Sequence, residues 1–270
     1  MVLMLSPEIL EYYQRGGEQE RLTAGAGRLE FLRTWDVLTR TLPPAPARIL
    51  DVGGATGIYA RPLAEAGHSV RVIDPVPEHV TTSGALDGVT AAVGDARDLP
   101  EADGSADAVL LLGPLYHLGD RADRLTAWRE AARVVRPGGV VVAAVISRYA
   151  SMLDGILKGF FADPAYVSMV DRTLTDGVHS HRGQVPRWFT SAYFHHPDEP
   201  AAEAAEAGLT AARTVAVEGP AWLTGPRLLE FLDDDHLRGV MLDHLRRVEA
   251  EPSLLGASSH LLTVAHRPAV

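Results

Sequence analysis

The sequence contains no cysteine among its 270 residues. This absence excludes disulfide bonds, thiolate zinc sites and a cysteine nucleophile in one step. Basic side chains are also few, with 25 Lys and Arg against 35 Asp and Glu, and the formal net charge is -10. Such a charge gives no electrostatic attraction to nucleic acid or to an anionic membrane surface. We therefore expect a small-molecule partner, with no nucleic acid and no membrane.

Long apolar runs are missing as well. No stretch approaches the roughly 18 apolar residues of a membrane span, and residues 1–8 lack the basic region of a secretory signal. Apolar residues make up 46% of the chain and charged residues 22%, which is ordinary for a globular protein. The sequence therefore predicts a folded, cytoplasmic protein, and it carries no signal of its oligomeric state.

Strand and helix patterns alternate through the middle of the chain. The apolar runs predict strands at 48–52, 69–73, 89–93, 107–112 and 139–146, with helices near 57–66, 76–84 and 121–135. This alternation is typical of right-handed βαβ units and a parallel sheet. Two further strands are expected at 210–217 and 259–266, and helices at 198–207 and 226–250. The fold class is therefore α/β, with a Rossmann-like, doubly wound, seven-stranded and mostly parallel sheet.

Four parts of the chain follow from these patterns. Residues 1–46 are expected to form a helical lid and residues 47–146 the core of the sheet. Residues 147–196 are too long for an ordinary loop after strand five and are expected to form an insertion that covers the substrate. Residues 197–270 would complete the sheet.

The segment ILDVGGATG at residues 49–57 is a strand that leads into a glycine-rich turn, with Asp51 just before the first glycine. Glycine turns after a strand let the backbone approach a nucleotide-like ligand closely. An acid at this point would repel a pyrophosphate, but it suits a cation. S-adenosylmethionine (SAM) carries an ammonium and a sulfonium beside its adenosine, so the turn favours a SAM pocket over a phosphate cradle.

Three further features follow in order. Asp74 ends the second strand 23 positions after Asp51, a spacing suited to holding a ribose diol. Asp95 ends the third strand, where it could accept from an adenine amine. The fourth strand leads into Gly113 to Leu118, and Pro137-Gly138-Gly139 precedes the fifth.

This ordered set resembles the class I SAM-dependent methyltransferases over residues 48–146. The resemblance implies that Asp51, Gly53, Gly54, Ala55 and Gly57 line the methionine half of SAM. It also implies that Asp74 holds the ribose hydroxyls, that Asp95 and Ala96 frame adenine, and that Gly113 lies near the sulfonium. Pro75 and Arg97, beside these acids, are assigned to the same cofactor site. Ala55 stands where the family has its middle glycine, and we expect a negative φ there.

Tyr116 and His117 follow the fourth strand, where the resemblance places the transferred methyl group. Histidine titrates near neutral pH, as a general base requires, so His117 is the first candidate base and Tyr116 the second. The alternative is a histidine held structurally beneath the lid.

Substrate contacts are expected from both covering segments: Tyr12, Tyr13 and Arg28 in the lid, and His181, Tyr193 and His195 in the insertion. The aromatic residues around Tyr193 could instead form the core of the insertion. The histidine pairs at 179/181 and 195/196 invite a metal hypothesis, but the sequence fixes no third ligand, and we expect no metal.

Together these features predict a SAM-dependent methyltransferase that moves the methyl group to an O, N or C nucleophile of a small molecule by in-line displacement. A SAM-binding cyclase or binding module that does not methylate is an alternative. An NAD(P)-dependent oxidoreductase on a similar sheet is a further alternative, against which Asp51 argues.

Overall fold

A nine-stranded sheet forms the centre of the structure, a computed structural model that describes residues 18–180 and 188–269. Its main path runs β3-β2-β1-β4-β5-β7-β6, and β9 pairs with β5 and β8. The strands are β1 (Arg48–Val52), β2 (Ser69–Asp74), β3 (Val89–Val93), β4 (Ala106–Leu111), β5 (Val135–Ser147), β6 (Val178–His179), β7 (Ala192–His195), β8 (Thr210–Ala216) and β9 (His260–His266). The ladders from β3 to β5 are all parallel, whereas β9 is antiparallel to both of its neighbours.

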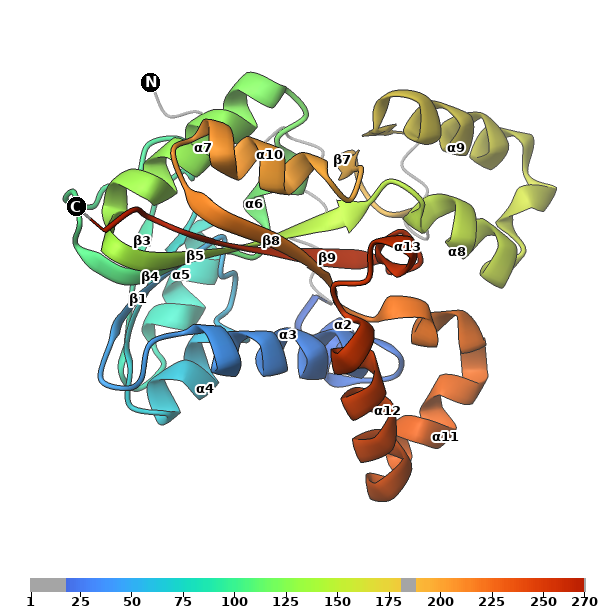
Figure 1. Ribbon diagram of the computed structural model, residues 1–270, viewed down its shortest axis with the longest axis horizontal. Coiled ribbons are helices and arrows are strands. Elements are labelled where there is room, and N and C mark those ends of the chain that lie inside the picture. Colours follow the sequence, from blue (N-terminus) through green and yellow to red (C-terminus); the bar gives the residue numbers. More distant parts are fainter. Residues whose placement is uncertain (1–17, 181–187, 270) are drawn as a thin grey trace.

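Helices cover both faces of this sheet (Figure 1). Those before β5 are α2 (Glu18–Thr23), α3 (Gly27–Thr41), α4 (Ala60–Glu65), α5 (Pro77–Gly84), α6 (Pro114–His117) and α7 (Arg121–Val134). Those after it are α8 (Ala150–Lys158), η1 (Phe160–Ala162), α9 (Pro164–Asp176), α10 (Glu199–Glu206), η3 (Gly219–Arg227), α11 (Leu228–Asp233), α12 (Asp235–Val248) and α13 (Pro252–Leu255). The predicted α/β, Rossmann-like and mostly parallel architecture is confirmed.

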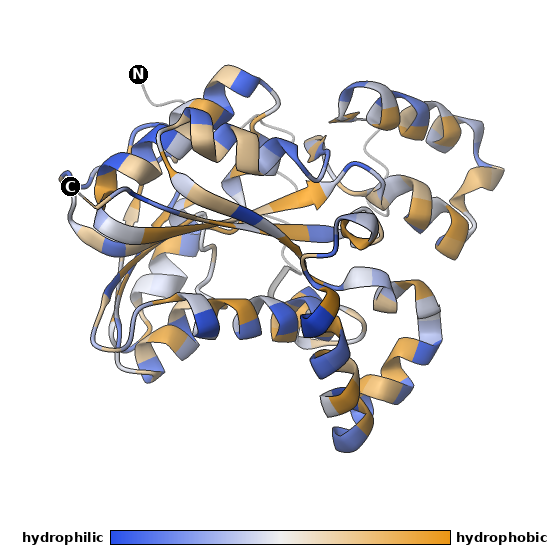
Figure 2. Cartoon of the chain, in the orientation of Figure 1, coloured by the Kyte–Doolittle hydropathy of each residue, from blue (hydrophilic) through white to orange (hydrophobic). Residues whose placement is uncertain are grey.

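Two hydrophobic layers lie on either side of the sheet. One joins α3 and α4 to it through Val37, Leu38 and Leu63, and the other joins α7 and α10 through Trp128 and Ala204. All five side chains are almost fully buried. The helices are accordingly two-sided in hydropathy (Figure 2), because one face of each packs on the sheet and the other meets solvent.

Side-chain caps set the ends of several helices. Asp120 accepts from the backbone of Ala122 at 2.9 Å and begins α7, and Asp163 does the same for α9. Gly177 ends α9 with a φ of +81°, a conformation that favours glycine. The helix expected at 226–250 is instead two helices, because Asp234 takes an extended backbone and caps α12.

The sheet has nine strands within the described residues and not the seven predicted. The two additional strands, β6 and β7, come from the insertion. β5 continues past the end of β4, and β7 pairs in parallel with Ile146 and Ser147 along the edge that β4 leaves. β6 then pairs with β7. Strands of two and four residues show too little alternation for the sequence to reveal them.

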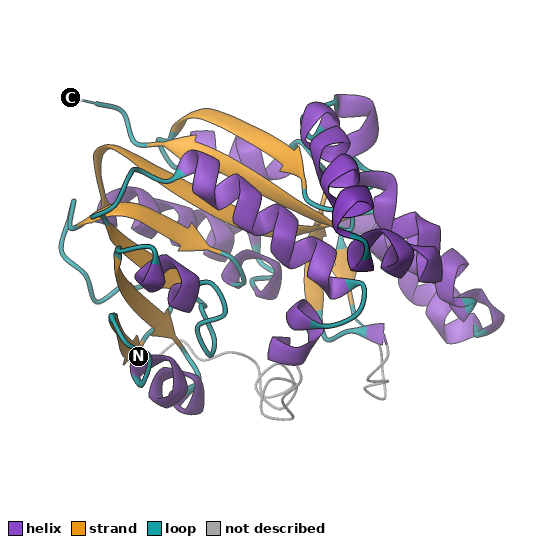
Figure 3. Cartoon of the chain, turned by 90° about the horizontal axis from the view of Figure 1, so that it is seen from below, coloured by secondary structure: helices purple, strands orange, loops and turns teal. Residues whose placement is uncertain are grey.

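The insertion and the C-terminal helices extend from the sheet in different directions. α8 and α9 lie beyond the end of β5, while α11 and α12 project on the side of α3 (Figure 1). Figure 3, a view from below, shows helices lying in front of the strands of the sheet. Among the described residues, no helix has the length and apolar composition needed to cross a membrane.

Candidate functional site

A cavity opens at the carboxyl ends of β1, β2, β3 and β4. From β1 the chain adds β2 and β3 on one side of the sheet, and it then adds β4 and β5 on the other side. Open parallel sheets bind ligands at such a switch point, which here lies between β1 and β4. Most of the residues predicted for the cofactor line this cavity: Asp51, Gly53, Gly54, Ala55, Asp74, Pro75, Asp95, Ala96, Arg97 and Gly113, together with Tyr116 and His117.

Asp51 is the only carboxylate of this cavity that has no hydrogen-bond partner among the described residues. Both of its oxygens are buried, and its side chain is 1% exposed. Burial raises the pKa of Asp51 to about 7, and repulsion from Asp74 adds to this effect. A buried carboxylate without partners is costly, and a cation in the cavity would offset that cost.

The glycine turn leaves room for the Asp51 carboxylate. A Cβ atom on Gly54 would lie 2.5 Å from the Asp51 Oδ2 atom, so any side chain at 54 would displace it. Gly53 has a φ of +72°, and a Cβ there would lie 2.9 Å from Pro114. Gly57 has a φ of +90°, and a Cβ there would lie 2.6 Å from Leu86; this glycine does not line the cavity.

Ala55 differs from the expectation of a negative φ. Its φ is +47°, in the left-handed region. The Ala55 N–H donates to the Asp74 Oδ2 atom at 3.0 Å, and this bond holds the backbone there. The turn therefore keeps the glycine-like shape of the family motif with an alanine in it.

Asp74 is anchored at the end of β2 by backbone and side-chain donors. Its Oδ1 atom accepts from the Val76 N–H at 2.9 Å and lies 3.1 Å from the His79 Nδ1 atom. Its Oδ2 atom accepts from Ala55. Because a carboxylate offers about four acceptor positions, these contacts orient the group and leave it able to accept from a ligand.

Asp95 is held by Arg97 in a bidentate pair. The Arg97 Nε and Nη2 atoms donate to the two carboxylate oxygens at 2.9 and 2.8 Å, and Arg97 Nη1 donates to Asp123. These hydrogen bonds raise the pKa of Arg97 above its ordinary value. Arg97 thus positions Asp95 at the cavity wall.

Tyr116 and His117 lie on α6, directly after β4. Their rings meet edge to face with centroids 4.6 Å apart, and Phe189 lies 6.3 Å from the His117 ring. Burial lowers the pKa of His117 to about 4, although a hydrogen bond with the backbone of Ser191 acts in the opposite direction. His117 is therefore neutral at physiological pH.

A second cavity adjoins the first, and Tyr116 lines both. One side of it is aromatic and comes from the insertion: Tyr166, His179, Trp188, Phe189 and Phe194. The other side is charged and comes from α2, α3 and the facing ends of β8 and β9: Arg21, Glu30, Glu218 and His260. Both covering segments of the chain thus contribute to this cavity.

The charged side contains a set of ion pairs. Arg21 pairs with Glu30, and the His260 Nδ1 atom lies 2.6 Å from Glu218 and 3.5 Å from Glu30. Burial alone would lower the pKa of His260, but Glu30 and Glu218 raise it to about 9. Burial alone would raise the pKa of Glu30, but His260 and Arg21 hold it below its ordinary value. The carboxylate oxygens of Glu30 and Glu218 and the ring nitrogen of His260, atoms of the kind that bind metals, lie within 4.8 Å of one another.

Several residues predicted to contact substrate lie elsewhere. On β7, Phe194 faces the second cavity, and strand alternation turns Tyr193 and His195 to the opposite face. There Tyr193 stacks on Arg124 at 3.7 Å, and His195 lies 3.6 Å from Glu203. Burial lowers the pKa of His195 despite Glu203.

Arg28 also lies outside both cavities, because it pairs with Asp233 at 2.6 Å and ties α3 to α11. Tyr12, Tyr13 and His181 lie outside the described residues. Two of the histidines of these pairs have different partners: His179 bonds to Ser151 and to the Trp188 carbonyl, whereas His196 contacts Tyr149.

Some cavity residues were missed from the sequence. His79, which contacts Asp74, is five positions after that acid on the next helix, and this spacing was a usable signal. Tyr59 and Pro114 also line the first cavity. Glu218 and His260 are 42 positions apart and meet only because β8 pairs with β9, so no local signal marked them.

Comparison with known proteins identifies the domain that carries the first cavity. The family described as a methyltransferase domain matches residues 50–143. An uncharacterized methyltransferase of Mycobacterium tuberculosis is 40% identical over 99 residues, which are 36% of this chain and 39% of that relative. The chain thus matches less than half the length of that relative. A ubiquinone biosynthesis O-methyltransferase of Xylella fastidiosa is 28% identical over 75% of this chain and 76% of its own.

The fold has solved counterparts. The crystal structure of a SAM-dependent methyltransferase from Methanosarcina mazei has a TM-score of 0.58 and 16% sequence identity, over 87% of this chain and 98% of that one. SAM fits the first cavity by charge, because the buried carboxylate of Asp51 would meet the ammonium of the cofactor. The chain therefore contains a class I SAM-dependent methyltransferase domain, with SAM as its cofactor.

Proposed function

We propose that the protein transfers a methyl group from SAM to a small-molecule acceptor. The observation that carries this proposal is the meeting of two cavities at Tyr116, one at the carboxyl ends of the parallel strands and one between the insertion and the N-terminal helices. SAM, when bound, supplies an electrophilic methyl group to an O, N or C nucleophile. A relative named for ubiquinone biosynthesis also favours a small-molecule acceptor.

The residues of the first cavity would hold the cofactor as their chemistry suggests. Asp51 would neutralise the ammonium group, and Asp74 would accept from the ribose hydroxyls. Asp95, positioned by Arg97, and Ala96 would frame adenine. Each of these side chains is already oriented in the structure, which lowers the entropic cost of binding.

The covering segments would hold the acceptor and exclude water. Residues up to 46, as the lid, contribute Arg21, Gly27 and Glu30 to the second cavity. The insertion at 147–196 contributes the aromatic side. Alignment of the reactants and exclusion of water can supply several kcal/mol, and up to about 7 to 11 in well-oriented systems.

His117 and Tyr116 are proposed as the groups nearest the acceptor nucleophile. His117 is uncharged at neutral pH, so its ring can accept a hydrogen bond from the nucleophile, although burial, which lowers its pKa to about 4, makes it a weaker base than an ordinary histidine. Tyr116 bridges the two cavities. We expect His117→Ala to lower turnover while affinity for S-adenosylhomocysteine is retained. His244→Ala, on an exposed part of α12, is the matched control. Full activity of His117→Ala would assign proton removal to another group or make it unnecessary.

The experiment that tests the function is incubation of the protein with methyl-labelled SAM and a metabolite extract. Label in a small-molecule product is expected. Calorimetry with S-adenosylhomocysteine, NADH and NADPH separates the alternatives. Binding of S-adenosylhomocysteine without label transfer would favour a non-methylating cyclase or binding module. Binding of NADH or NADPH instead would favour an oxidoreductase.

A further inference from the structure

The charged side of the second cavity presents one ring nitrogen that its ion pairs do not use. Among the described residues, the polar contacts of the His260 ring all run through its Nδ1 atom, to Glu218 and Glu30. His260 lines the cavity and its side chain is 21% exposed. Its Nε2 atom is therefore left for a group within the cavity.

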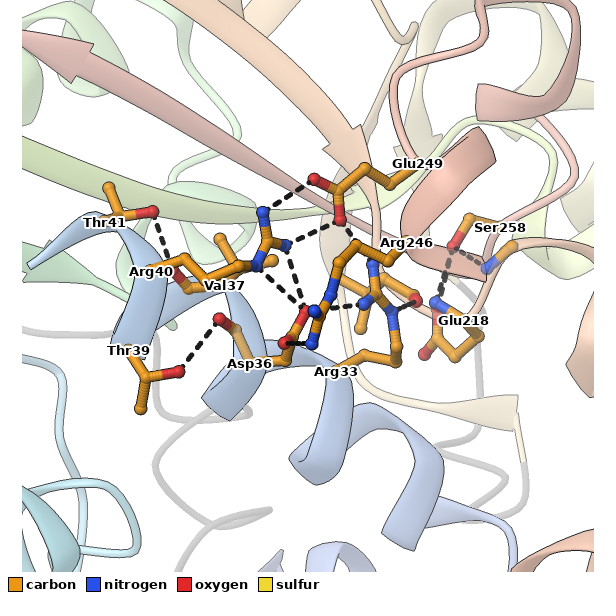
Figure 4. Close-up of polar contacts among 12 residues, drawn as sticks. Arg33, Asp36, Val37, Thr39, Arg40, Thr41, Glu218, Arg246, Glu249 and Ser258 are labelled. Carbon is orange, nitrogen blue, oxygen red and sulfur yellow. Dashed lines mark hydrogen bonds and ion pairs between the residues drawn. The ribbon is translucent and has the colours of Figure 1, made fainter. Parts of the chain in front are cut away.

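Glu218 fixes the ring in this orientation. One carboxylate oxygen accepts from the Ser258 hydroxyl and from the His260 backbone N–H, both at 2.9 Å. The other accepts from the His260 ring at 2.6 Å. Ser258 in turn accepts from the backbone of Glu218 and Gly219 at 3.1 Å (Figure 4 shows Ser258 beside Glu218). A carboxylate so anchored holds an imidazole with its Nε2 in one direction.

The charged side chains around the ring pair with one another. Arg21 pairs with Glu30, and Glu218 pairs with His260. On α8, which also lines the cavity, Lys158 pairs with Asp154 at 2.7 Å. Because the charges of the described residues on this side are paired, these residues offer little to an ionic ligand. A hydrogen bond from the charged His260 to a neutral oxygen is the interaction it favours.

The opposite side of the cavity is aromatic. Trp188 packs against Tyr166 with ring centroids 5.2 Å apart, and Phe194 stacks on His179 at 4.5 Å with an angle of 5°. Aromatic walls of this kind bind planar apolar rings.

We propose that the second cavity takes an uncharged aromatic acceptor whose hydroxyl or carbonyl oxygen accepts a hydrogen bond from the His260 Nε2 atom. This inference rests on the proposed function, which it deepens by naming the class of acceptor. Glu218 is the positioning residue, because it acts on the acceptor only through the ring of His260.

The test compares two small probes by direct binding, without turnover. The probes are 4-nitrophenol and 4-nitrotoluene, which match in ring, nitro group and size, and only the phenol has the hydroxyl oxygen that the proposal places against His260. We expect the protein saturated with S-adenosylhomocysteine to bind the phenol at least tenfold more tightly. Absorbance provides a second readout at pH 6, because a hydrogen bond donated to the oxygen of the uncharged phenol shifts the absorption band of the bound probe.

Two variants complete the design. His260→Gln should abolish the preference for the phenol and the absorbance shift. Trp188→Leu, on the aromatic side, should weaken both probes alike. S-adenosylhomocysteine should bind both variants as it binds the wild type, which also reports that they fold.

The outcomes separate this inference from the proposed function. Failure of the wild type to bind S-adenosylhomocysteine would contradict the proposed function. If it binds that ligand but shows equal affinity for the two probes, or no affinity for either at millimolar concentration, the inference about His260 is wrong. This comparison uses the wild-type protein, so it holds even if a variant does not fold.

Discussion

The buried carboxylate of Asp51 destabilises the ligand-free protein when it is ionised. Its carboxylate is buried with no hydrogen-bond partner among the described residues and lies near Asp74, and its pKa is about 7. An ordinary Asp has a pKa of 3.8. The folded protein therefore holds a proton on Asp51 between about pH 4 and 7 that the unfolded chain releases. Ligand-free stability should fall as the pH rises through this window.

Cofactor affinity should follow the same titration with the opposite sign. The ammonium of S-adenosylhomocysteine favours ionised Asp51, so binding releases the proton that Asp51 carries below pH 7. We expect affinity at pH 8 to exceed that at pH 6 by roughly tenfold, in line with one proton per site. Calorimetry across this range measures the effect.

The matched variant for this titration is Asp51→Asn, which keeps the size of the side chain and removes its charge. It should bind more weakly, by roughly 10- to 100-fold at pH 8, and its affinity should not change between pH 6 and 8. An unchanged pH dependence in Asp51→Asn would show that another group titrates on binding.

Ala55 carries backbone strain within the same turn. A left-handed conformation costs an L-residue roughly 1–2 kcal/mol, and glycine avoids this cost while losing about 1 kcal/mol of chain entropy. We therefore expect Ala55→Gly, with φ at +47° in the wild type, to leave the free energy of unfolding unchanged or slightly higher. Ala202→Gly, in the exposed part of α10, should lower it by about 1 kcal/mol. Urea denaturation measures both variants. A loss of about 1 kcal/mol in the free energy of unfolding of Ala55→Gly would show that the backbone of Ala55 is not strained.

At the scale of elements, α3 is joined to the C-terminal part of the chain by a network of ion pairs (Figure 4). Arg33 is fully buried and donates to Glu249 at 2.7 Å, to Asp36 at 2.8 Å and to the Val217 carbonyl at 3.1 Å. Arg40 contacts both of these carboxylates, and Arg246 also pairs with Asp36. The network fixes α3, which bears Glu30, against β8 and α12.

Removal of one buried partner from this network leaves the others uncompensated. We expect Arg33→Met to lower the free energy of unfolding by roughly 3–5 kcal/mol. Arg247→Met, which removes an exposed pair with Asp243, should cost less than about 1 kcal/mol. Thermal and urea denaturation of the two variants measure the difference, and similar values for both would mean that the buried network adds nothing.

At the scale of the whole molecule, the first helices and the last strands meet at His260. Glu30 on α3 and Glu218 after β8 both raise its pKa to about 9, against 6.5 for an ordinary His. Because the folded protein binds this proton more tightly than the unfolded chain, the contribution to stability is complete below pH 6.5. It is lost as the pH rises through 9.

The wild type should therefore lose on the order of 3 kcal/mol of stability between pH 7 and 10 through this group. His260→Gln cannot titrate, so its stability should change less over the same range. Urea denaturation at several pH values compares the two profiles. Parallel profiles would show that His260 does not couple these parts of the molecule.

The sequence predicted the parts of the molecule whose cause is local. The acids predicted for the cofactor lie at or next to the ends of three strands: Asp51 with the glycines after it, Asp74 and Asp95. Parallel strands place these ends at one edge of the sheet. The strands before β5 were correct to within a residue or two for the same reason, because each is a short segment built around apolar residues. Ala55 was misjudged because the hydrogen bond from its N–H to Asp74 comes from another strand.

Only the tertiary structure decided the second cavity. Tyr193 and His195 were expected to contact substrate, but the pairing of β7 with β5 turns them toward Arg124 and Glu203 and leaves Phe194 in the cavity. His260 gains its role from Glu218 and Glu30, which lie 42 and 230 positions away in the chain. Local periodicity determines which segments become strands and which turns bind the cofactor. Contacts between distant segments depend instead on how the strands pair, and no local pattern encodes that pairing.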